Sequence, residues 1–196
     1  GVFKYETVNW DDRLVGDDTT NPIPSFIGKK INNMFFYRNR LGLLSNEAVI
    51  MSRAGDYFNF FANSSQVVAA DDPIDLQATS VRPVSLNYTL STSVGLIVFG
   101  PNEQFLLSTD ADVLSPTTTK INTVSTFECD SSVDAVAVGT AQAFISKSNL
   151  YSKLFVMLNI QKEAAASIDE ATQNVPEYVP SDIDTMVSSP AMSIIS

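Results

Sequence analysis

Short β-prone runs, closely spaced by turn residues, are the feature that most constrains what this chain can fold into. Between residues 31 and 62 four of them follow one another: "INNMFFY", "RLGLLS", "EAVIMSR" and "DYFNFF". Runs of this length, rich in aromatic and branched residues and bounded by Asn, Gly and Asp, are typical of strands. Residues 1–30 instead contain paired acids, two prolines and an Asn-Pro step. That composition predicts a loop-rich lead-in to the first set of strands.

Further sets of the same kind follow along the chain. Residues 82–130 contain "VSLNYTLST", "VGLIVFG", "EQFLLST" and "TKINTVSTFECD", with "GPNE" as a tight hairpin turn. Residues 133–162 contain "AVAVG", "AQAFISKS" and "YSKLFVMLNIQ", and residues 183–196 begin what looks like a fourth set. The stretch "NSSQVVAADDPIDLQATSVRP" reads as a connection with one short extended piece. One short helix is expected in "KEAAASIDEATQ", because three successive alanines favour α-structure.

The recurrence of these sets predicts the fold class. Sets of about four short strands at intervals of roughly 40 to 50 residues are what the blades of a β-propeller produce. The sequence therefore predicts a mainly β protein, with antiparallel sheets arranged as propeller-like blades; the alternative is a β-sandwich or a stack of antiparallel meanders. Most closed propellers need more than the four blades expected here. Together with an opening "GVFKY" that lacks Met and a strand-like ending, this leads us to expect a piece of a longer chain.

Charge and cysteine content exclude several classes of protein. Twelve Lys and Arg against 22 Asp and Glu give a net charge of −10, which opposes nonspecific adhesion to nucleic acid or anionic lipid. A negative wall still suits a polyanion that must slide past without sticking. No run in the chain approaches the roughly 18 apolar residues of a membrane span, and residues 1–30 do not show the basic-then-apolar order typical of a signal peptide. Cys129 has no second cysteine to pair with and is expected to be a small buried hydrophobe rather than a nucleophile.

Catalytic equipment is scarce. The absence of histidine removes the usual general base and the commonest zinc ligand. Gly28-Lys29-Lys30 lacks the other residues of a phosphate-binding loop. We therefore assign no catalytic, cofactor-binding or metal-binding residue and expect no cofactor. A glycosidase needs only two acids, and "DDPID" and "DADV" offer oxygens to calcium without EF-hand spacing, but capping of turns is the favoured role. The candidate carboxylates are Asp11, Asp12, Asp17, Asp18, Asp71, Asp72, Asp75, Asp110, Asp112, Asp182 and Asp184.

Three arginines flank strands that look buried. Arg38, Arg40 and Arg53 are expected to satisfy carbonyl groups or a carboxylate of a neighbouring loop or subunit, in preference to binding phosphate. The aromatic "DYFNFF" is expected to form a sheet layer or an intersubunit patch. The predicted core of the first set consists of Leu41, Leu43, Leu44, Val49, Ile50 and Met51.

The segment "TNPIPSFIGKKINNMFFYRNRLGLLSNEAVIMSRAGDYFNFF" resembles the nozzle proteins, or tail tubular proteins B, of short-tailed bacteriophages (podoviruses). The similarity continues in the same order through "DDPIDLQATSVRPVSLNYTL", "GLIVFGPNEQFLLST", "VLSPTTTKINTV", "SKSNLYSKL" and "NVPEYVP". It extends over nearly the whole chain, and "RNRLGLLS" followed by "VIMSRAGDYFNFF" is its strongest part. Each piece alone would be unspecific.

The resemblance implies a non-enzymatic virion protein. Residues 1–196 would be the central, propeller-like part of a longer nozzle protein that forms a homohexameric ring in the tail. Viral double-stranded DNA would pass through the ring during ejection without specific binding. The implied partners are the tail adaptor protein and the tail fibres, with assembly in the bacterial host cytoplasm. The alternatives are a tail-associated carbohydrate-active (depolymerase-like) domain and a receptor-binding domain.

Overall fold

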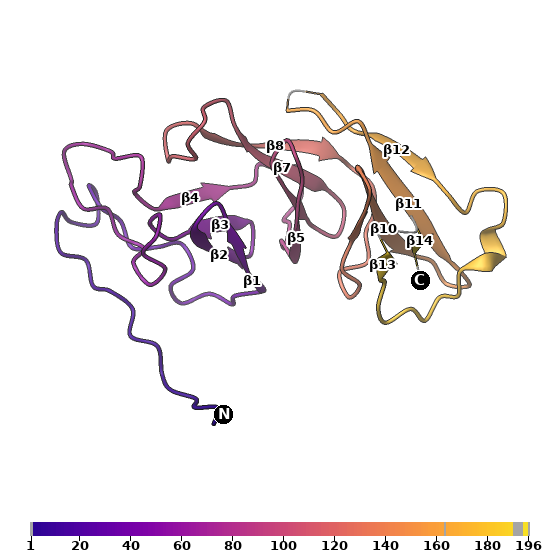
Figure 1. Ribbon diagram of the computed structural model, residues 1–196, viewed down its shortest axis with the longest axis horizontal. Coiled ribbons are helices and arrows are strands. Elements are labelled where there is room, and N and C mark those ends of the chain that lie inside the picture. The colour runs from indigo at the N-terminus through magenta and orange to yellow at the C-terminus, as the bar shows by residue number, and fades with distance from the viewer. Residues whose placement is uncertain (1, 163, 190–193, 196) are drawn as a thin grey trace.

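The described residues form three four-stranded antiparallel sheets placed in a row and joined by loops, besides one two-stranded sheet near the C-terminus (Figure 1). The computed structural model describes residues 2–162, 164–189 and 194–195. In each sheet, strands that are neighbours in sequence are neighbours in space, so every sheet is a meander. Residues 2–9 extend away from the body, as Figure 1 shows. The expectation of a mainly β, antiparallel protein is confirmed.

Tight turns set the register of the first sheet. Arg38 and Asn39 form a two-residue turn in which both residues have positive φ, at 46° and 60°. Asn46, with φ 51°, starts the next turn. Asn tolerates this left-handed backbone better than most residues, and such turns match the twist of paired strands. The strands of sheet 1 are β1 (Asn33–Tyr37), β2 (Arg40–Ser45), β3 (Ala48–Met51) and β4 (Ile74–Gln77).

The prediction that "DYFNFF" forms the fourth strand of this sheet is wrong. Residues 56–61 form no strand: the peptide N–H of Asp56 donates to the carbonyl of Arg53 across a tight turn in which Gly55 has a positive φ of 77°, residues 57–58 form another turn, and residues 59–61 are irregular. The fourth strand is β4, which lies in the stretch expected to be a connection with one short extended piece. Aromatic residues favour strands through packing rather than through the backbone itself. Here the aromatic side chains find their packing partners without joining the sheet.

The second sheet agrees with the predicted strands. "GPNE" forms the turn between its two central strands, where the N–H of Gly100 donates to the carbonyl of Glu103 at 2.9 Å. Every residue of those two strands is buried. The strands of sheet 2 are β5 (Tyr88–Ser91), β6 (Leu96–Phe99), β7 (Gln104–Thr109) and β8 (Thr119–Ser125).

The third sheet contains the second error. The prediction of a helix over residues 162–173 is wrong, because residues 167–170 form a strand that pairs with β11. Glu163 lies outside the described residues. Pairing and packing outweigh the helix propensity of the alanines: Ala166 donates its N–H to the carbonyl of Val124, and Ile168 packs against a buried cluster. The strands of sheet 3 are β9 (Val136–Val138), β10 (Ala141–Lys147), β11 (Ser152–Leu158) and β12 (Ser167–Glu170).

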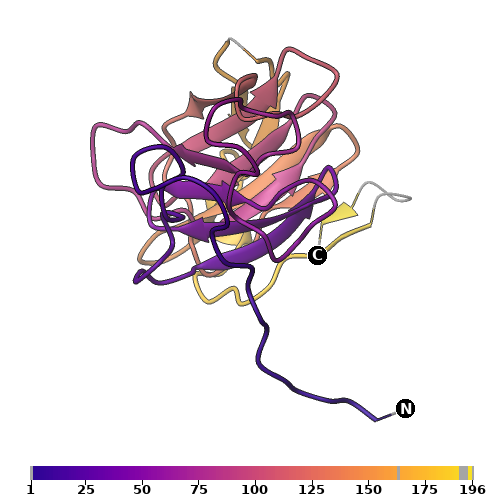
Figure 2. The same cartoon turned by 90° about the vertical axis from the view of Figure 1, so that its left-hand side faces the viewer.

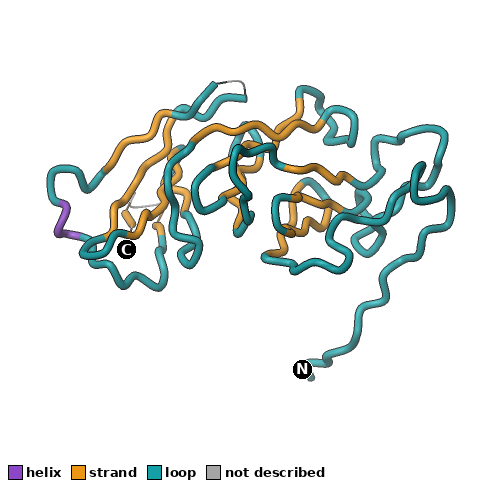
Figure 3. Tube along the Cα trace, turned by 180° about the vertical axis from the view of Figure 1, so that it is seen from behind, coloured by secondary structure: helices purple, strands orange, loops and turns teal. Residues whose placement is uncertain are grey.

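The last part of the chain adds little regular structure. A single 3-10 turn, η1 (Pro176–Tyr178), is the one helical element among the described residues and is coloured purple in Figure 3. The predicted fourth set over residues 183–196 contains the short paired strands β13 (Ser188–Ser189) and β14 (Ile194–Ile195). Residues 190–193 and 196 of that set lie outside the described ones. A fourth blade therefore stays a prediction.

The sheets pack face to face, and sheet 2 is covered on both sides. Along β6, Leu96 and Val98 belong to a core shared with sheet 1, whereas Ile97 and Phe99 belong to a core shared with sheet 3. Equivalent strands lie against each other: β1 against β5, β4 against β8, and β9 against β13. Figure 2 looks along the row, with the sheets one behind another. Burying each large apolar side chain contributes about 1.5–3 kcal/mol before entropy is counted.

The predicted core of the first set is confirmed, since all six of its residues are buried. They are divided between the two faces of sheet 1. Leu44, Val49 and Met51 pack toward sheet 2. The other three, Leu41, Leu43 and Ile50, pack on the outer face of sheet 1 with Phe60 and Phe26.

Candidate functional site

Arg40, the first residue of β2, is the most highly connected polar side chain of the molecule's first sheet. It is 1% exposed, and its guanidinium donates to the carbonyl oxygens of Ser52 at 2.8 Å, Asp72 at 2.7 Å, Ala70 at 2.8 Å and Leu114 at 3.1 Å. These bonds join sheet 1, the loop before β4 and the loop between β7 and β8. The expected role of satisfying carbonyl groups is confirmed for this arginine.

The charge of Arg40 is balanced from nearby. Burial lowers the pKa of the Arg40 guanidinium, and the carboxylates of Asp71 and Asp72 oppose that shift. An arginine starts from so high a pKa that it keeps its charge at neutral pH. The site is therefore a buried cation among carbonyl dipoles and two carboxylates, which is a structural anchor rather than an open anion site.

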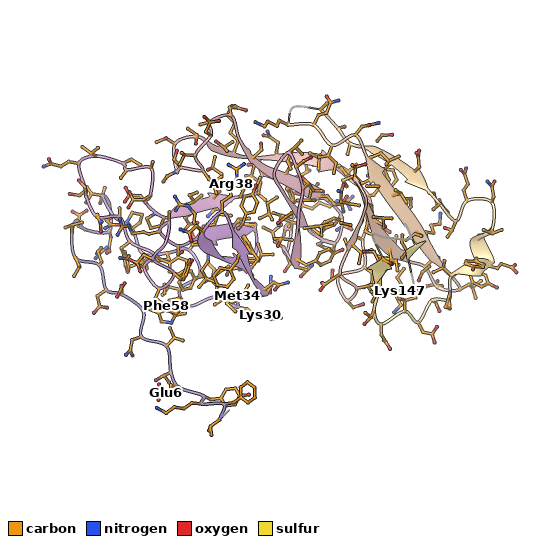
Figure 4. The ribbon with its side chains drawn as sticks, viewed as in Figure 1. Glu6, Lys30, Met34, Arg38, Phe58 and Lys147 are labelled. Carbon is orange, nitrogen blue, oxygen red and sulfur yellow. The ribbon has the colours of Figure 1, made fainter. Side chains whose placement is uncertain are left out.

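The other two arginines singled out by the sequence also make structural contacts. Arg53 forms an ion pair with Asp71 and lies 3.9 Å from Asp56. Arg38 is at the tip of the β1–β2 turn, labelled in Figure 4, where its guanidinium reaches the carbonyl of Asp112 at 3.4 Å. The structure thus brings Arg40 and Arg53 together around residues 71–72 and leaves Arg38 apart. These contacts favour the structural role over phosphate binding.

The candidate carboxylates are dispersed. Asp17 accepts the N–H groups of Thr19 and Thr20, and the bonds from Thr20 are the main cause that lowers the pKa of Asp17. Asp72 accepts the N–H groups of Asn63 and Ala69. This is the turn-capping role expected from the sequence.

The remaining candidate acids form hydrogen bonds or ion pairs, or they are exposed. Asp75 accepts the N–H of Ser25, and Asp18 accepts from Arg13. Asp110 binds Lys120 at 2.8 Å, and this bond is the main cause that lowers the pKa of Asp110. The described residues include no group of three or more His, Cys, Asp or Glu placed to hold a metal ion. The other candidates are exposed: Asp11, Asp12, Asp112, Asp182 and Asp184.

Cys129 lies buried between sheets 2 and 3, as expected. Its Sγ is 2.7 Å from the hydroxyl oxygen of Tyr88, the first residue of β5. Burial raises the pKa of Cys129 to about 11, and burial also raises the pKa of Tyr88. The thiol is therefore protonated at neutral pH and is no nucleophile.

An aromatic cluster covers part of the outer face of sheet 1. Trp10 packs against Phe58 and Phe60 with ring centroids 5.8 and 5.7 Å apart, and Phe26 joins them. "DYFNFF" thus supplies part of a layer on the sheet, which was one of its two expected roles. Met34 and Phe36 of β1 remain 60% and 64% exposed beside this cluster. Figure 4 labels Met34 and Phe58 on the side from which the N-terminal segment leaves.

Two of the cavities that border sheet 3 are formed together with other segments of the chain. One, of about 670 Å³, is mainly apolar and lies between β10, β11 and the segment that follows β12, with Ile145, Leu154, Tyr178 and Met186 in its wall. The other, which we call the inter-sheet groove, measures about 390 Å³. It is formed by Ser91–Val94, Ala137, Gly139, Thr140, Gln142 and Leu158–Ile160.

Sequence reasoning found neither the Tyr88–Cys129 pair nor the inter-sheet groove. Their residues come from strands and turns more than forty positions apart, or from different sheets. A polar Gln142 at the start of the apolar run "AFI" was the one local signal available. No helix in the described part of the chain is long and apolar enough to cross a membrane.

Comparison with known proteins gives two matches. The family model described as "Bacteriophage nozzle protein" matches residues 1–196. The tail tubular protein gp12 of Escherichia phage T7 is 31% identical over 190 residues, which are 96% of this chain and 24% of that protein. The chain therefore spans about a quarter of the length of this curated relative.

Proposed function

Since the chain belongs to the bacteriophage nozzle protein family, we propose that it is a propeller-like block in the wall of a tail nozzle through which viral DNA is ejected. The family and the phage T7 relative support a structural role in the phage tail. To this role the proposal adds ring formation, passage of DNA and the lack of catalysis.

The observation that supports it best is the stacking of equivalent strands. β1 lies against β5 and β4 against β8, so successive meanders are placed like neighbouring blades. Each blade buries its faces on the next, and two buried cores hold the three sheets together. A block of this kind is suited to bearing load in a wall, because stacked sheets are close-packed and deform little.

Charge supports the proposed passage of DNA. The net charge of −10 disfavours adhesion of a polyanion. Exposed acids are concentrated in loops, including Asp11, Asp12 and Asp18 before sheet 1 and Asp182 and Asp184 after sheet 3. Acids placed in this way would allow DNA to pass without binding. In this proposal the full-length protein is a hexameric ring in the virion tail, assembled in the host cytoplasm, with the adaptor protein and the tail fibres as partners.

Electron microscopy of the full-length protein that contains this chain tests the proposal. We expect ring-shaped particles with an open channel, and density for stacked sheets in the wall. Particles that stay monomeric or dimeric at every concentration would overturn it. A DNA mobility-shift assay at low salt is the companion measurement, in which no retention of DNA is expected.

The carbohydrate-active alternative is tested separately. Asp72 and Asp75 both line a cavity of about 260 Å³, but each already accepts backbone N–H groups. We expect no turnover in a screen of bacterial polysaccharides. Reproducible turnover that disappears in Asp72→Asn or Asp75→Asn would contradict the non-enzymatic proposal.

A further inference from the structure

The outer face of sheet 3, which is turned away from sheet 2, is apolar. Phe155 and Met157 of β11 pack toward sheet 2. Because successive side chains of a strand point to opposite faces, Leu154 and Val156 lie on the outer face. Ile145 of β10 is opposite Leu154 in register and lies on the same face. An antiparallel sheet that faces water on one side carries polar residues there, so sheet 3 has the pattern of a sheet that is covered on both faces.

The described residues that follow β12 cover one part of this outer face. Met186 and Ile195 pack there with Ile145, which is 3% exposed. Beside them lies the apolar cavity of about 670 Å³, in whose wall Leu154 is half-buried and Tyr178 is 82% exposed. On sheet 1, by contrast, aromatic side chains of the chain itself pack on the outer face. The outer face of sheet 3 is therefore covered in part and open in part.

The strands β13 and β14 have the position of the first two strands of a further sheet. β13 lies against β9, as β1 lies against β5 between sheets 1 and 2. β13 and β14 pair antiparallel, as the first two strands of each other sheet do. Between sheets 1 and 2 the fourth strands also meet, because β4 lies against β8. The described part of the chain contains no strand that lies in this way on the outer face of β12.

From these observations we propose that the open part of this face is the docking site for two further strands of the same protein, which continue the sheet begun by β13 and β14. The inference rests on the proposed function, in which the chain is one part of a longer nozzle protein. Each four-stranded sheet here is a meander, so the next strand pairs with the free edge of β14 and lies over β11. It presents apolar side chains to Leu154 and Val156. A strand of the same protein reaches this place through one short turn, which a second copy of the chain cannot do.

Thiol labelling of the full-length protein that contains this chain tests the proposal. Tyr178→Cys places a thiol in the wall of the apolar cavity. Leu150→Cys is the matched control, because Leu150 is 77% exposed but lies outside that wall. Both side chains are exposed, so the fold should remain, and the unsubstituted protein measures the background from other cysteines. We expect a maleimide to label Tyr178→Cys about tenfold more slowly than Leu150→Cys, because the docked strands must first open locally.

Labelling of monomers and of assembled particles, separated by size, identifies what covers the face. Slow labelling of Tyr178→Cys in both fractions supports strands of the same protein. Slow labelling confined to assembled particles would mean that a second copy covers the face, and equal labelling of the two variants would mean that nothing does; either result overturns the inference. Rings seen by electron microscopy together with equal labelling would remove this inference and leave the proposed function in place. Slow labelling in a protein that never assembles would do the reverse.

Discussion

The two interfaces of sheet 2 differ although the same strands build both. The interface with sheet 1 is mainly aliphatic, with Leu44, Ile74, Leu96 and Leu107 in its core, and Arg40 closes one end. The interface with sheet 3 is aromatic. There Tyr88 stacks on Phe99 with ring centroids 4.7 Å apart, and Phe144 stacks on Phe155 at 5.5 Å.

The two interfaces of sheet 2 also differ in their buried polar groups. In the aliphatic interface, both terminal nitrogens of the buried Arg40 guanidinium donate to carbonyl groups. The aromatic interface contains the Tyr88–Cys129 pair and ends in the inter-sheet groove with the unpaired oxygen of Gln142. The two faces of one repeated sheet can therefore be packed with different side chains and carry different buried polar groups. Four predictions sharpen this contrast, and each is measured as a free energy of unfolding in urea.

Loss of the guanidinium that closes the aliphatic interface should have the largest effect. Arg40→Met leaves several buried carbonyl oxygens without a donor, each at a cost of about 1–3 kcal/mol, so a loss of about 4 kcal/mol or more is expected. Arg82→Met, at an exposed arginine, should stay within about 0.5 kcal/mol. Equal losses in the two variants would mean that Arg40 is not an anchor.

Truncation inside the same interface should come next. Leu107→Ala removes a fully buried side chain that packs between sheets 1 and 2, and it should cost about 3 kcal/mol through lost burial and a residual cavity. Leu150→Ala, at an exposed position, is the comparison and should change stability little. A loss below about 1 kcal/mol for Leu107→Ala would show that the sheets are not firmly packed there.

The aromatic interface should respond to pH through Cys129. Because the folded-state pKa of about 11 lies above the ordinary value of 9.0, the thiol's contribution is complete below about pH 9 and is lost as the pH rises toward 11. Between about pH 8 and 10.5 the wild type should lose about 2 kcal/mol more than Cys129→Ala. Tyr88 is present in both proteins, so its own titration largely cancels. Identical pH dependence of the two proteins would contradict the buried, protonated thiol.

The smallest effect is expected on the outer face of sheet 1. Phe36→Ser removes a side chain that is 64% exposed and touches Tyr57, so the loss should be below about 1 kcal/mol. Phe35→Ser, on the opposite face of β1, should cost clearly more, because Phe35 packs against the core shared with sheet 2. The reverse order would mean that the faces of β1 have been assigned wrongly.

Prediction from sequence succeeded where local pattern and burial agree. "RLGLLS", "EAVIM", "GLIVFG" and "QFLLST" are β-prone, bounded by turn residues and buried, and all four form strands. It failed for "DYFNFF" and "KEAAASIDEATQ", where distant partners decide the outcome. Trp10 and Phe26 meet the aromatic side chains of the first, and β11 pairs with part of the second.

The candidate site was predictable in part. The structural roles of Arg40 and of Asp17 follow from residue type and position at a strand end or in a turn, and the structure agrees. The inter-sheet groove is formed by three chain reversals in two different sheets. No local sequence pattern indicates which chain reversals lie next to each other in the fold.

By itself, the amino-acid sequence determined that this is an acidic, antiparallel β protein with tight turns, because turn residues, apolar runs and charge act over a few neighbouring residues. The sequence also determined that the protein belongs to the nozzle family. Only the tertiary structure decided which strand completes each sheet, which face of sheet 2 is aliphatic, and where Gln142 remains without a partner. The reason is that pairing and packing join residues far apart in the chain, and their free energies exceed the propensity of any short segment.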